Sequence, residues 1–268
     1  MKKSVLNISV FQLALIAITS CTKVVNINLN KADPKLVIEA NLSDLPSSCI
    51  VNLTKTVNFD EPNTFPAVSG AVVTIIDNLG NSATLTETTS GVYSAPLYVG
   101  VGGRTYTLSV TAEGKTYTAT STMPNPVAID TLVQVNVSVG VSGKNSKCVK
   151  LAYHDPVGIA NYYRTVRITN DTISKTIFLA TDHFGDGSVI NQTLFYDLDP
   201  SLRTGDSVKV LLQTIDKGVY DYFSSLKQLS AGGINQSATP ANPISNINGS
   251  ALGYFSAHGE RTKAIKIQ

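Results

Sequence analysis

Residues 105–119 read TYTLSVTAEGKTYTA, two alternating segments on either side of the dipeptide Glu113-Gly114. In both segments, aromatic or aliphatic residues alternate with Thr and Ser, which is the period-two pattern of a strand with one buried face. Glycine accepts the positive φ angles of a tight turn, so Glu113-Gly114 predicts the connection between two antiparallel strands. The stretch therefore predicts a β-hairpin, and its pattern recurs along most of the chain.

The same period continues towards the N-terminus in five further segments of strand length. Gly, Asn and Asp separate these segments, for example at Asp77–Asn81, as expected for turns between strands. The segments are 35–40, 50–54, 71–76, 83–87 and 92–94. About seven short strands in roughly a hundred residues are typical of an immunoglobulin-like or transthyretin-like β-sandwich. We expect this N-terminal β-sandwich to span residues 35–125.

A proline-rich segment marks an internal boundary. Met123-Pro124-Asn125-Pro126 contains two prolines, which remove amide donors from a strand ladder and so end the preceding strand. Beyond it, further segments have the composition of strands: 131–139, 149–153, 162–169, 175–181, 194–197, 207–215 and 252–257. We expect a second antiparallel β domain over residues 126–268.

One segment of the second domain has helical spacing instead. Within residues 220–229, four apolar side chains recur on one face of a helix: Tyr222, Phe223, Leu226 and Leu229. Such a stripe indicates core packing more often than a binding surface. The expected fold class is therefore mainly β, with an N-terminal sandwich followed by a second antiparallel β domain that carries one short helix.

The N-terminus has the features of a bacterial lipoprotein signal. Two lysines precede an apolar run from Val5 to Ile18, which is too short to span a bilayer comfortably. The small residues Thr19 and Ser20 then leave room for a peptidase, and the Cys21 thiol can accept a diacylglycerol thioether. We expect a signal peptide over 1–20, lipid attachment at Cys21 and a tether over 21–34. A plain secretory peptide that ends at a cysteine by chance is the alternative.

Charge excludes one class of partner. The full chain has 21 basic and 19 acidic residues, and loss of residues 1–20 removes two lysines, so the mature protein is formally neutral. Lys and Arg are also scattered along the chain. Neither observation favours nucleic-acid binding. We expect the membrane contact to be made through the N-terminal lipid.

Two further cysteines, Cys49 and Cys148, would lie in an oxidising compartment that permits a disulfide. Cys49 alternates with Val51 and Leu53, so it is expected to point inward. Cys148 is out of phase with the apolar residues that follow it and is expected to point outward. The pattern weighs against a bridge between Cys49 and Cys148, which remains the alternative. Neither cysteine has a partner at zinc-ligand spacing.

Motifs of common enzyme classes are absent from the sequence. It contains no Gly-x-Ser-x-Gly elbow, no phosphate loop and no His-Glu-x-x-His. The glycine-rich segment 100–103 leads into a strand and not into a helix, so it predicts a turn and not a dinucleotide site. We therefore expect no catalytic residue and no cofactor.

Two short motifs resemble metal sites. His154-Asp155 is a single adjacent pair, which more often indicates the end of a strand before an Asp-Pro turn. Residues 182–188 read DHFGDGS, with acids at the first and fifth positions of a calcium loop. Phe184 and Thr193 occupy positions where that loop needs oxygen ligands. We therefore expect a hairpin turn there and no metal.

Aromatic residues provide the remaining candidate contacts. Tyr162 and Tyr163 must point to opposite faces of a strand, and the same holds for Tyr254 and Phe255. One residue of each pair, together with Arg164, is a candidate for a contact surface, and core packing is the favoured alternative. The chain has no Trp, which lowers the expectation of a sugar-stacking platform.

Several ordered segments resemble a known family. In the first half these are Leu36–Ala40, Gly70–Ile75, Gly91–Tyr93 and Gly103–Leu108, and in the second half Asp155–Arg164, Arg203–Val208, Tyr220–Phe223, Pro240–Ile247 and Gly249–Ala257. With the lipoprotein signal, they resemble an uncharacterised family of Bacteroidetes lipoproteins that carry a domain of unknown function. The resemblance covers essentially the whole mature chain. It implies an outer-membrane lipoprotein that is encoded beside TonB-dependent receptors, and it implies no catalytic residue.

These features lead to one expected function and two alternatives. We expect a lipid-anchored, non-enzymatic outer-membrane protein that is an accessory or ligand-capture partner of a TonB-dependent receptor. The first alternative is a free-standing surface lipoprotein that binds a glycan or a peptide. The second is a hydrolase whose site the sequence does not show. The membrane face is left open, because no acidic residue follows Cys21 before Asp33.

Overall fold

The computed structural model describes residues 33–268, apart from 59–60, 140–143, 184, 196–201 and 231–241. The expected signal peptide, Cys21 and almost all of the expected tether lie outside the described residues. Residues from Pro34 to Gln268 form one compact unit. The described part of this unit is mainly β, with one helix, α2 (Lys217–Ser230).

Seven strands lie within residues 36–122, the number predicted for the N-terminal half. They are β1 (Leu36–Ser43), β2 (Ile50–Lys55), β3 (Val72–Asp77), β4 (Ser82–Thr89), β5 (Val92–Ser94), β6 (Thr105–Ala112) and β7 (Lys115–Thr122). The predicted hairpin is confirmed, because β6 pairs with β7 along its whole length. Glu113 and Gly114 have φ angles of 50° and 73°, the two positive values of a type I′ turn.

The described residues of the second half form nine strands. They are β8 (Thr131–Val139), β9 (Lys144–His154), β10 (Tyr162–Thr169), β11 (Thr172–Ile173), β12 (Phe178–Thr181), β13 (Val189–Leu194), β14 (Ser207–Ile215), β15 (Ile247–Asn248) and β16 (Leu252–Lys266). The predicted strands 162–169 and 207–215 match β10 and β14. The prediction over 175–181 was wrong at its start, because the Ser174 hydroxyl accepts the Thr176 amide and turns the chain there.

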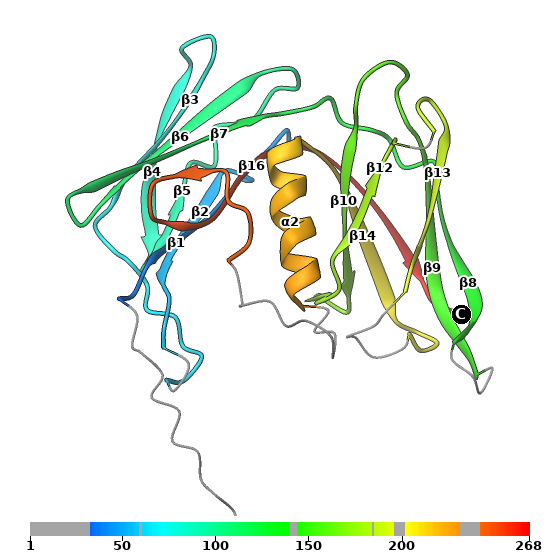
Figure 1. Ribbon diagram of the computed structural model, residues 1–268. Coiled ribbons are helices and arrows are strands. Elements are labelled where there is room, and N and C mark those ends of the chain that lie inside the picture. Colours follow the sequence, from blue (N-terminus) through cyan, green and yellow to red (C-terminus); the bar gives the residue numbers. More distant parts are fainter. Residues whose placement is uncertain (1–32, 59–60, 140–143, 184, 196–201, 231–241) are drawn as a thin grey trace, which may run out of the picture. The chain divides into compact units, whose positions relative to one another are not determined.

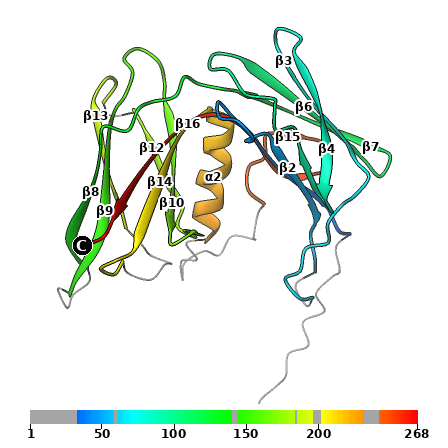
Figure 2. The ribbon, with the colours of Figure 1, turned by 180° about the vertical axis from the view of Figure 1, so that it is seen from behind.

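Strand β16 joins the two halves into one sheet (Figures 1 and 2). Its first part pairs in parallel with β1, from Leu252 opposite Val37 to His258 opposite Ser43. Its second part pairs antiparallel with β14. Within the described residues, the resulting 13-stranded sheet has the order β11-β10-β14-β16-β1-β2-β5-β4-β3-β6-β7-β15, with β12 attached to β10. The parallel pair differs from the antiparallel pairing expected for most of the chain, and it is possible because no hairpin constrains strands so distant in sequence.

A second sheet of three strands has the order β13-β9-β8. Buried apolar side chains form one cluster from the first half together with residues 247–257, and another from residues 127–267. A third cluster lies under α2, where Val219, Tyr222 and Phe223 pack with Ile215 and Tyr254. The predicted helical stripe is therefore confirmed at Tyr222 and Phe223. It was wrong at Leu229, which is 38% exposed, because the helix extends beyond the cluster that it covers.

Candidate functional site

The candidate contact residues separate into two groups. Tyr163 and Phe255 are fully buried in two different core clusters, which removes them from any contact surface. Each is the inward member of its pair, as strand alternation requires. Tyr162, Arg164 and Tyr254 lie together beside α2. Tyr162 and Arg164 are half-buried, whereas Tyr254 is buried in the third cluster and is therefore also removed from a contact surface. The sequence predicted that the two residues of each pair point to opposite faces. It did not show that α2 lies over the face that carries Tyr162, Arg164 and Tyr254.

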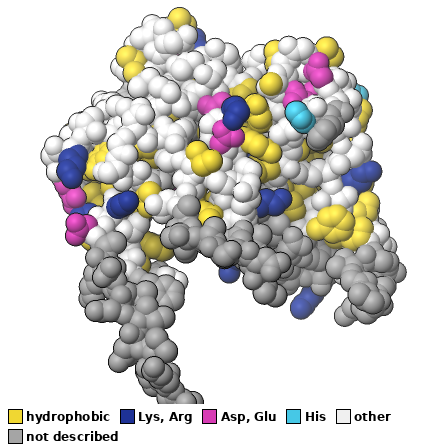
Figure 3. Space-filling view, viewed as in Figure 1, with side chains coloured by type: hydrophobic (Ala, Val, Ile, Leu, Met, Phe, Trp, Pro, Cys, Tyr) yellow, Lys and Arg dark blue, Asp and Glu magenta, His cyan; other side chains and the backbone are white. Residues whose placement is uncertain are grey.

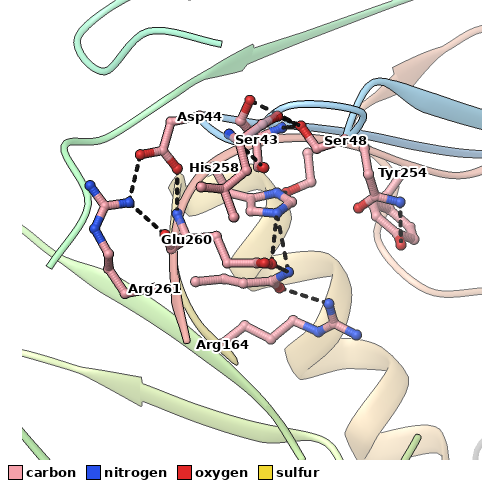
Figure 4. Close-up of polar contacts among 12 residues, drawn as sticks. Ser43, Asp44, Ser48, Arg164, Tyr254, His258, Glu260 and Arg261 are labelled. Carbon is pink, nitrogen blue, oxygen red and sulfur yellow. Dashed lines mark hydrogen bonds and ion pairs between the residues drawn. The ribbon is translucent and has the colours of Figure 1, made fainter. Parts of the chain in front are cut away.

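Arg164 is the centre of this group. Its guanidinium lies 4.0 Å from the ring centroid of Phe223, a cation–π arrangement. Its Nη1 donates to the Gln213 side-chain oxygen at 2.8 Å, as Figure 4 shows beside the helix. Burial lowers the pKa of Arg164. Phe223 in turn packs against Tyr254, with ring centroids 4.9 Å apart, so one cation links the helix to the sheet.

Next to Arg164, alternate residues of β16 form a buried polar row. The Ser256 hydroxyl lies 2.9 Å from His258 Nδ1, and the Gln213 amide nitrogen lies 3.1 Å from His258 Nε2. Because an amide nitrogen only donates, His258 Nε2 must accept and the ring proton belongs on Nδ1. The same amide nitrogen donates to Glu260 at 2.9 Å. Ser256 and His258 are 2% and 3% exposed, so this row does not present a nucleophile to a substrate.

The β1–β2 connection is tied to the same strand. Arg261 Nη1 lies 2.7 Å from the Asp44 carboxylate, and the Glu260 amide donates to the other Asp44 oxygen at 2.8 Å. Figure 4 shows both contacts at the end of the polar row. They fix the position of the connection against β16.

A cluster of three carboxylates lies at the end of β9. One oxygen each from Asp155, Asp182 and Asp186 lies within 4.8 Å of the others. Asp155 is 4% exposed. In Figure 3, acidic side chains meet at the surface on the side of β12 and β13. The sequence suggested the loop 182–188 and Asp155 separately, and it gave no sign that they meet.

Hydrogen bonds hold each carboxylate in place. Asp155 accepts the Tyr163 hydroxyl at 2.5 Å and the Gly187 amide at 3.1 Å. Asp182 accepts the Asn161 amide at 2.8 Å, and Asp186 accepts the Gly158 amide through both oxygens. These bonds orient the acids independently of any ion.

The predicted hairpin turn at residues 182–188 was wrong. The loop connects β12 and β13, but β12 pairs with β10 and β13 pairs with β9, so the two strands belong to different sheets. The pairing of Val189 with His154 brings this loop against the residue that follows β9, which is Asp155. His154 ends β9, as predicted, and its Nδ1 lies 2.6 Å from Asp130, so the adjacent pair His154-Asp155 does not act as one metal site.

A groove of about 400 Å³ lies between β4 and residues 94–98. Its lining combines the hydroxyls of Ser82, Thr84, Thr86 and Ser94 with Ala83, Ala95, Pro96, Leu97 and Tyr98, and none of these side chains is charged. Leu97 is 96% exposed. The Tyr98 hydroxyl donates to the Asn81 carbonyl oxygen at 2.9 Å, and burial raises the pKa of Tyr98 to about 12. Such a lining suits a neutral ligand with many hydroxyl groups.

The two cysteines of the body lie in separate segments: Cys49 directly precedes β2, and Cys148 lies on β9. Cys49 is buried, as predicted, in the first core cluster, where it is a free thiol, and burial raises its pKa to about 11. Cys148 on β9 is also fully buried, so the outward prediction was wrong. Its neighbour Val149 is buried too. Successive strand residues point to opposite faces, so both faces of β9 are covered here. The alternation of apolar residues therefore does not indicate which side chains of this strand are exposed.

Comparison with known proteins identifies a family and no curated relative. A family model described as a domain of unknown function, DUF4249, matches residues 22–264. No curated protein matches the chain. The matched range begins at the residue after Cys21 and includes the polar row, the three carboxylates and the groove.

Proposed function

The chain belongs to the DUF4249 family. We propose that it is a lipid-anchored, non-enzymatic outer-membrane protein that assists a TonB-dependent receptor or captures its ligand. One observation carries the proposal: the family match starts directly after Cys21. The expected leader over 1–20 and Cys21 both precede the matched range, which supports the proposal. None of the described helices is long and apolar enough to cross a bilayer.

The lipid would contribute directly to partner binding. Each buried methylene contributes about 0.8 kcal/mol, so several acyl chains make a durable anchor. Confinement to the plane of the membrane raises the effective concentration of the protein beside a receptor. A modest contact surface is then sufficient.

Two neighbouring loops supply such a surface. The apolar loop pair, residues 43–48 and 96–101, is held together because the Ser47 amide donates to the Pro96 carbonyl and the Gly100 amide to the Ser43 carbonyl. Four of its large apolar side chains are exposed: Leu45, Leu97, Val99 and Val101. Adjacent exposed apolar groups on a folded domain are a feature of partner surfaces.

The finer architecture belongs to the same proposal. We infer two β modules, a sandwich over 35–125 and a second antiparallel β module over 126–268. The separate core clusters of the two regions support this division, and β16 would contribute to both.

Co-purification tests the partnership. The tagged, lipidated protein is extracted from outer membranes in detergent, and stoichiometric recovery of a TonB-dependent receptor is expected. Leu97→Asp should reduce recovery at least tenfold, whereas the control Leu79→Asp, at another exposed leucine, should leave it unchanged. Recovery of the wild-type protein without a receptor contradicts the partnership. A Cys21→Ser variant should leave the membrane fraction, and its retention there would contradict the lipid anchor.

A second candidate function is capture of a neutral glycan. The groove between β4 and residues 94–98 favours it, because hydroxyl groups and one Tyr ring line it without charge. Isothermal titration of the Cys21→Ser protein with neutral oligosaccharides tests this candidate. Binding that is lost in Thr84→Val and kept in Thr111→Val, a substitution outside the groove, supports it. Absence of binding to the wild-type groove contradicts it.

A further inference from the structure

We propose that Asp155, Asp182 and Asp186 bind one calcium ion between the two sheets. The three residues come from the segment after β9 and from the loop between β12 and β13. β9 and β13 belong to the three-stranded sheet, whereas β12 belongs to the large sheet. The site is independent of the proposed function.

The spacing of the carboxylates fits calcium. Two ligands of one ion are separated by no more than twice the metal–oxygen distance, which is roughly 4.6–5.2 Å for Ca²⁺ and about 4.0–4.2 Å for Mg²⁺. The oxygens of the three aspartates lie within 4.8 Å of one another. Three oxygens this close together can converge on one calcium ion, and three carboxylates are hard ligands of the kind that Ca²⁺ prefers.

A buried hydroxyl gives independent support for a ligand. Tyr153 is fully buried, and its hydroxyl has no hydrogen-bond partner among the described residues. An unsatisfied buried polar group of this kind indicates a water or an ion that completes it.

Tyr153 lies next to the residues that hold the carboxylates. It is the second-last residue of β9, and Asp155 directly follows the end of that strand. The Tyr153 ring packs edge-on against Tyr163 at 4.8 Å, and the Tyr163 hydroxyl donates to Asp155. Besides burial, the charge of Asp155 raises the pKa of Tyr153. A water bound to the calcium ion would give the Tyr153 hydroxyl its missing partner.

The existing hydrogen bonds are compatible with calcium. Each carboxylate oxygen has two lone pairs, so an oxygen that accepts an amide proton can also bind a metal. The amides of Asn161, Gly158 and Gly187 hold the three acids in place. The ion would thus enter a site that is already ordered, and waters would complete the six to eight oxygen ligands that calcium takes.

The bound ion would act as a cross-link between the sheets. Calcium sites in extracellular modules bind with dissociation constants of about 0.1–1 mM. At a hundredfold excess over the dissociation constant, binding stabilises the folded state by about 2.7 kcal/mol. Removal of calcium would loosen the β12–β13 loop against β9.

Terbium luminescence tests the site on the Cys21→Ser protein that contains the full mature domain. Terbium, which replaces calcium, is expected to give emission sensitised by Tyr153 and Tyr163, and calcium should displace it. Calcium should also raise the melting temperature relative to buffer with EDTA. Absence of both effects in 10 mM calcium, on the order of ten times the weakest expected dissociation constant, overturns the proposal.

Variants locate the site. Asp186→Asn, at an exposed position, should weaken terbium binding at least tenfold, whereas Asp171→Asn, an exposed aspartate in another turn, should not. Tyr153→Phe should leave the calcium-free melting temperature unchanged or higher and reduce the shift that calcium produces. Wild-type terbium affinity in Asp186→Asn would overturn the assignment, and Asp182→Asn provides a second test of it.

Discussion

Gly253 on β16 lies so close to Ile38 on β1 that a Cβ atom at Gly253 would lie 2.0 Å from the Ile38 carbonyl oxygen. Gly253 also has a φ angle of 102°, which side chains rarely adopt. The parallel pairing of β1 and β16 therefore depends on the absence of one side chain.

Gly253→Ala should destabilise the protein severely. The backbone conformation costs about 1 kcal/mol for a residue other than glycine, and the contact with β1 adds an overpacking cost of about 1–3 kcal/mol. Gly103→Ala is the matched control, because Gly103 has a positive φ but open space around it. Urea unfolding should separate the two variants by at least 1 kcal/mol. Equal stability would show that β16 can move away from β1 at no cost.

Arg164→Ala should lower stability by about 2 kcal/mol. The variant loses a charge-assisted hydrogen bond to Gln213 and the contact with the Phe223 ring. Arg164→Lys should recover less than half of the loss, because an ammonium group does not reproduce the planar stack. Chemical denaturation provides the measurement, with the exposed Arg203→Ala as control. Full recovery in the lysine variant would mean that charge alone matters.

His258 should be in the Nδ1–H tautomer when it is neutral. Arg164 donates to the Gln213 oxygen, which fixes the amide orientation and turns its nitrogen towards His258 Nε2. Nitrogen-15 NMR of labelled histidine distinguishes the two tautomers directly. Gln213→Met should remove the preference, and an Nε2–H tautomer in the unmodified protein would contradict the hydrogen-bond assignment.

Acid stability should depend on Glu87. The amides of Gly70 and Gly91 donate to its carboxylate, which lowers its pKa to about 2 from 4.5. A depressed folded-state pKa stabilises the protein above the unfolded value, and that stabilisation is lost as the pH falls from 4.5 to about 2. Glu87→Gln should therefore be less stable than wild type at pH 7 and should lose less stability over this range. Asp33→Asn, at an exposed position, serves as the control in pH-dependent thermal unfolding.

Local pattern was sufficient for most strands and insufficient for their partners. Period-two alternation and turn residues placed β6, β7, β10 and β14 correctly, because each is half-buried and bounded by turn residues. The C-terminal half of β16 was missed. His258 to Lys263 contains no aliphatic residue, and its strand form depends on β14 beside it. Tertiary pairing, and not local composition, determines such a strand.

The candidate site shows the same limit. Tyr162 and Arg164 could be selected from the sequence because strand alternation places both on the face opposite Tyr163. The role of Phe223 as a partner of Arg164 depends on the position of α2. Asp155 could not be joined to Asp182, since only the pairing of β9 with β13 brings their segments together. Carboxylates far apart in a chain form a site only through topology.

The pairing of β1 with β16 also governs how the chain reaches its native state. Contacts at this seam join residues as distant as Asp44 and Arg261, which are 217 positions apart. Closing such a long loop must precede the gain from the contacts, so high contact order makes folding slow. Until β16 is available, β1 exposes an unpaired edge to other chains. A chaperone that shields this edge would therefore do more for the yield of folded protein than any change within the N-terminal hairpins.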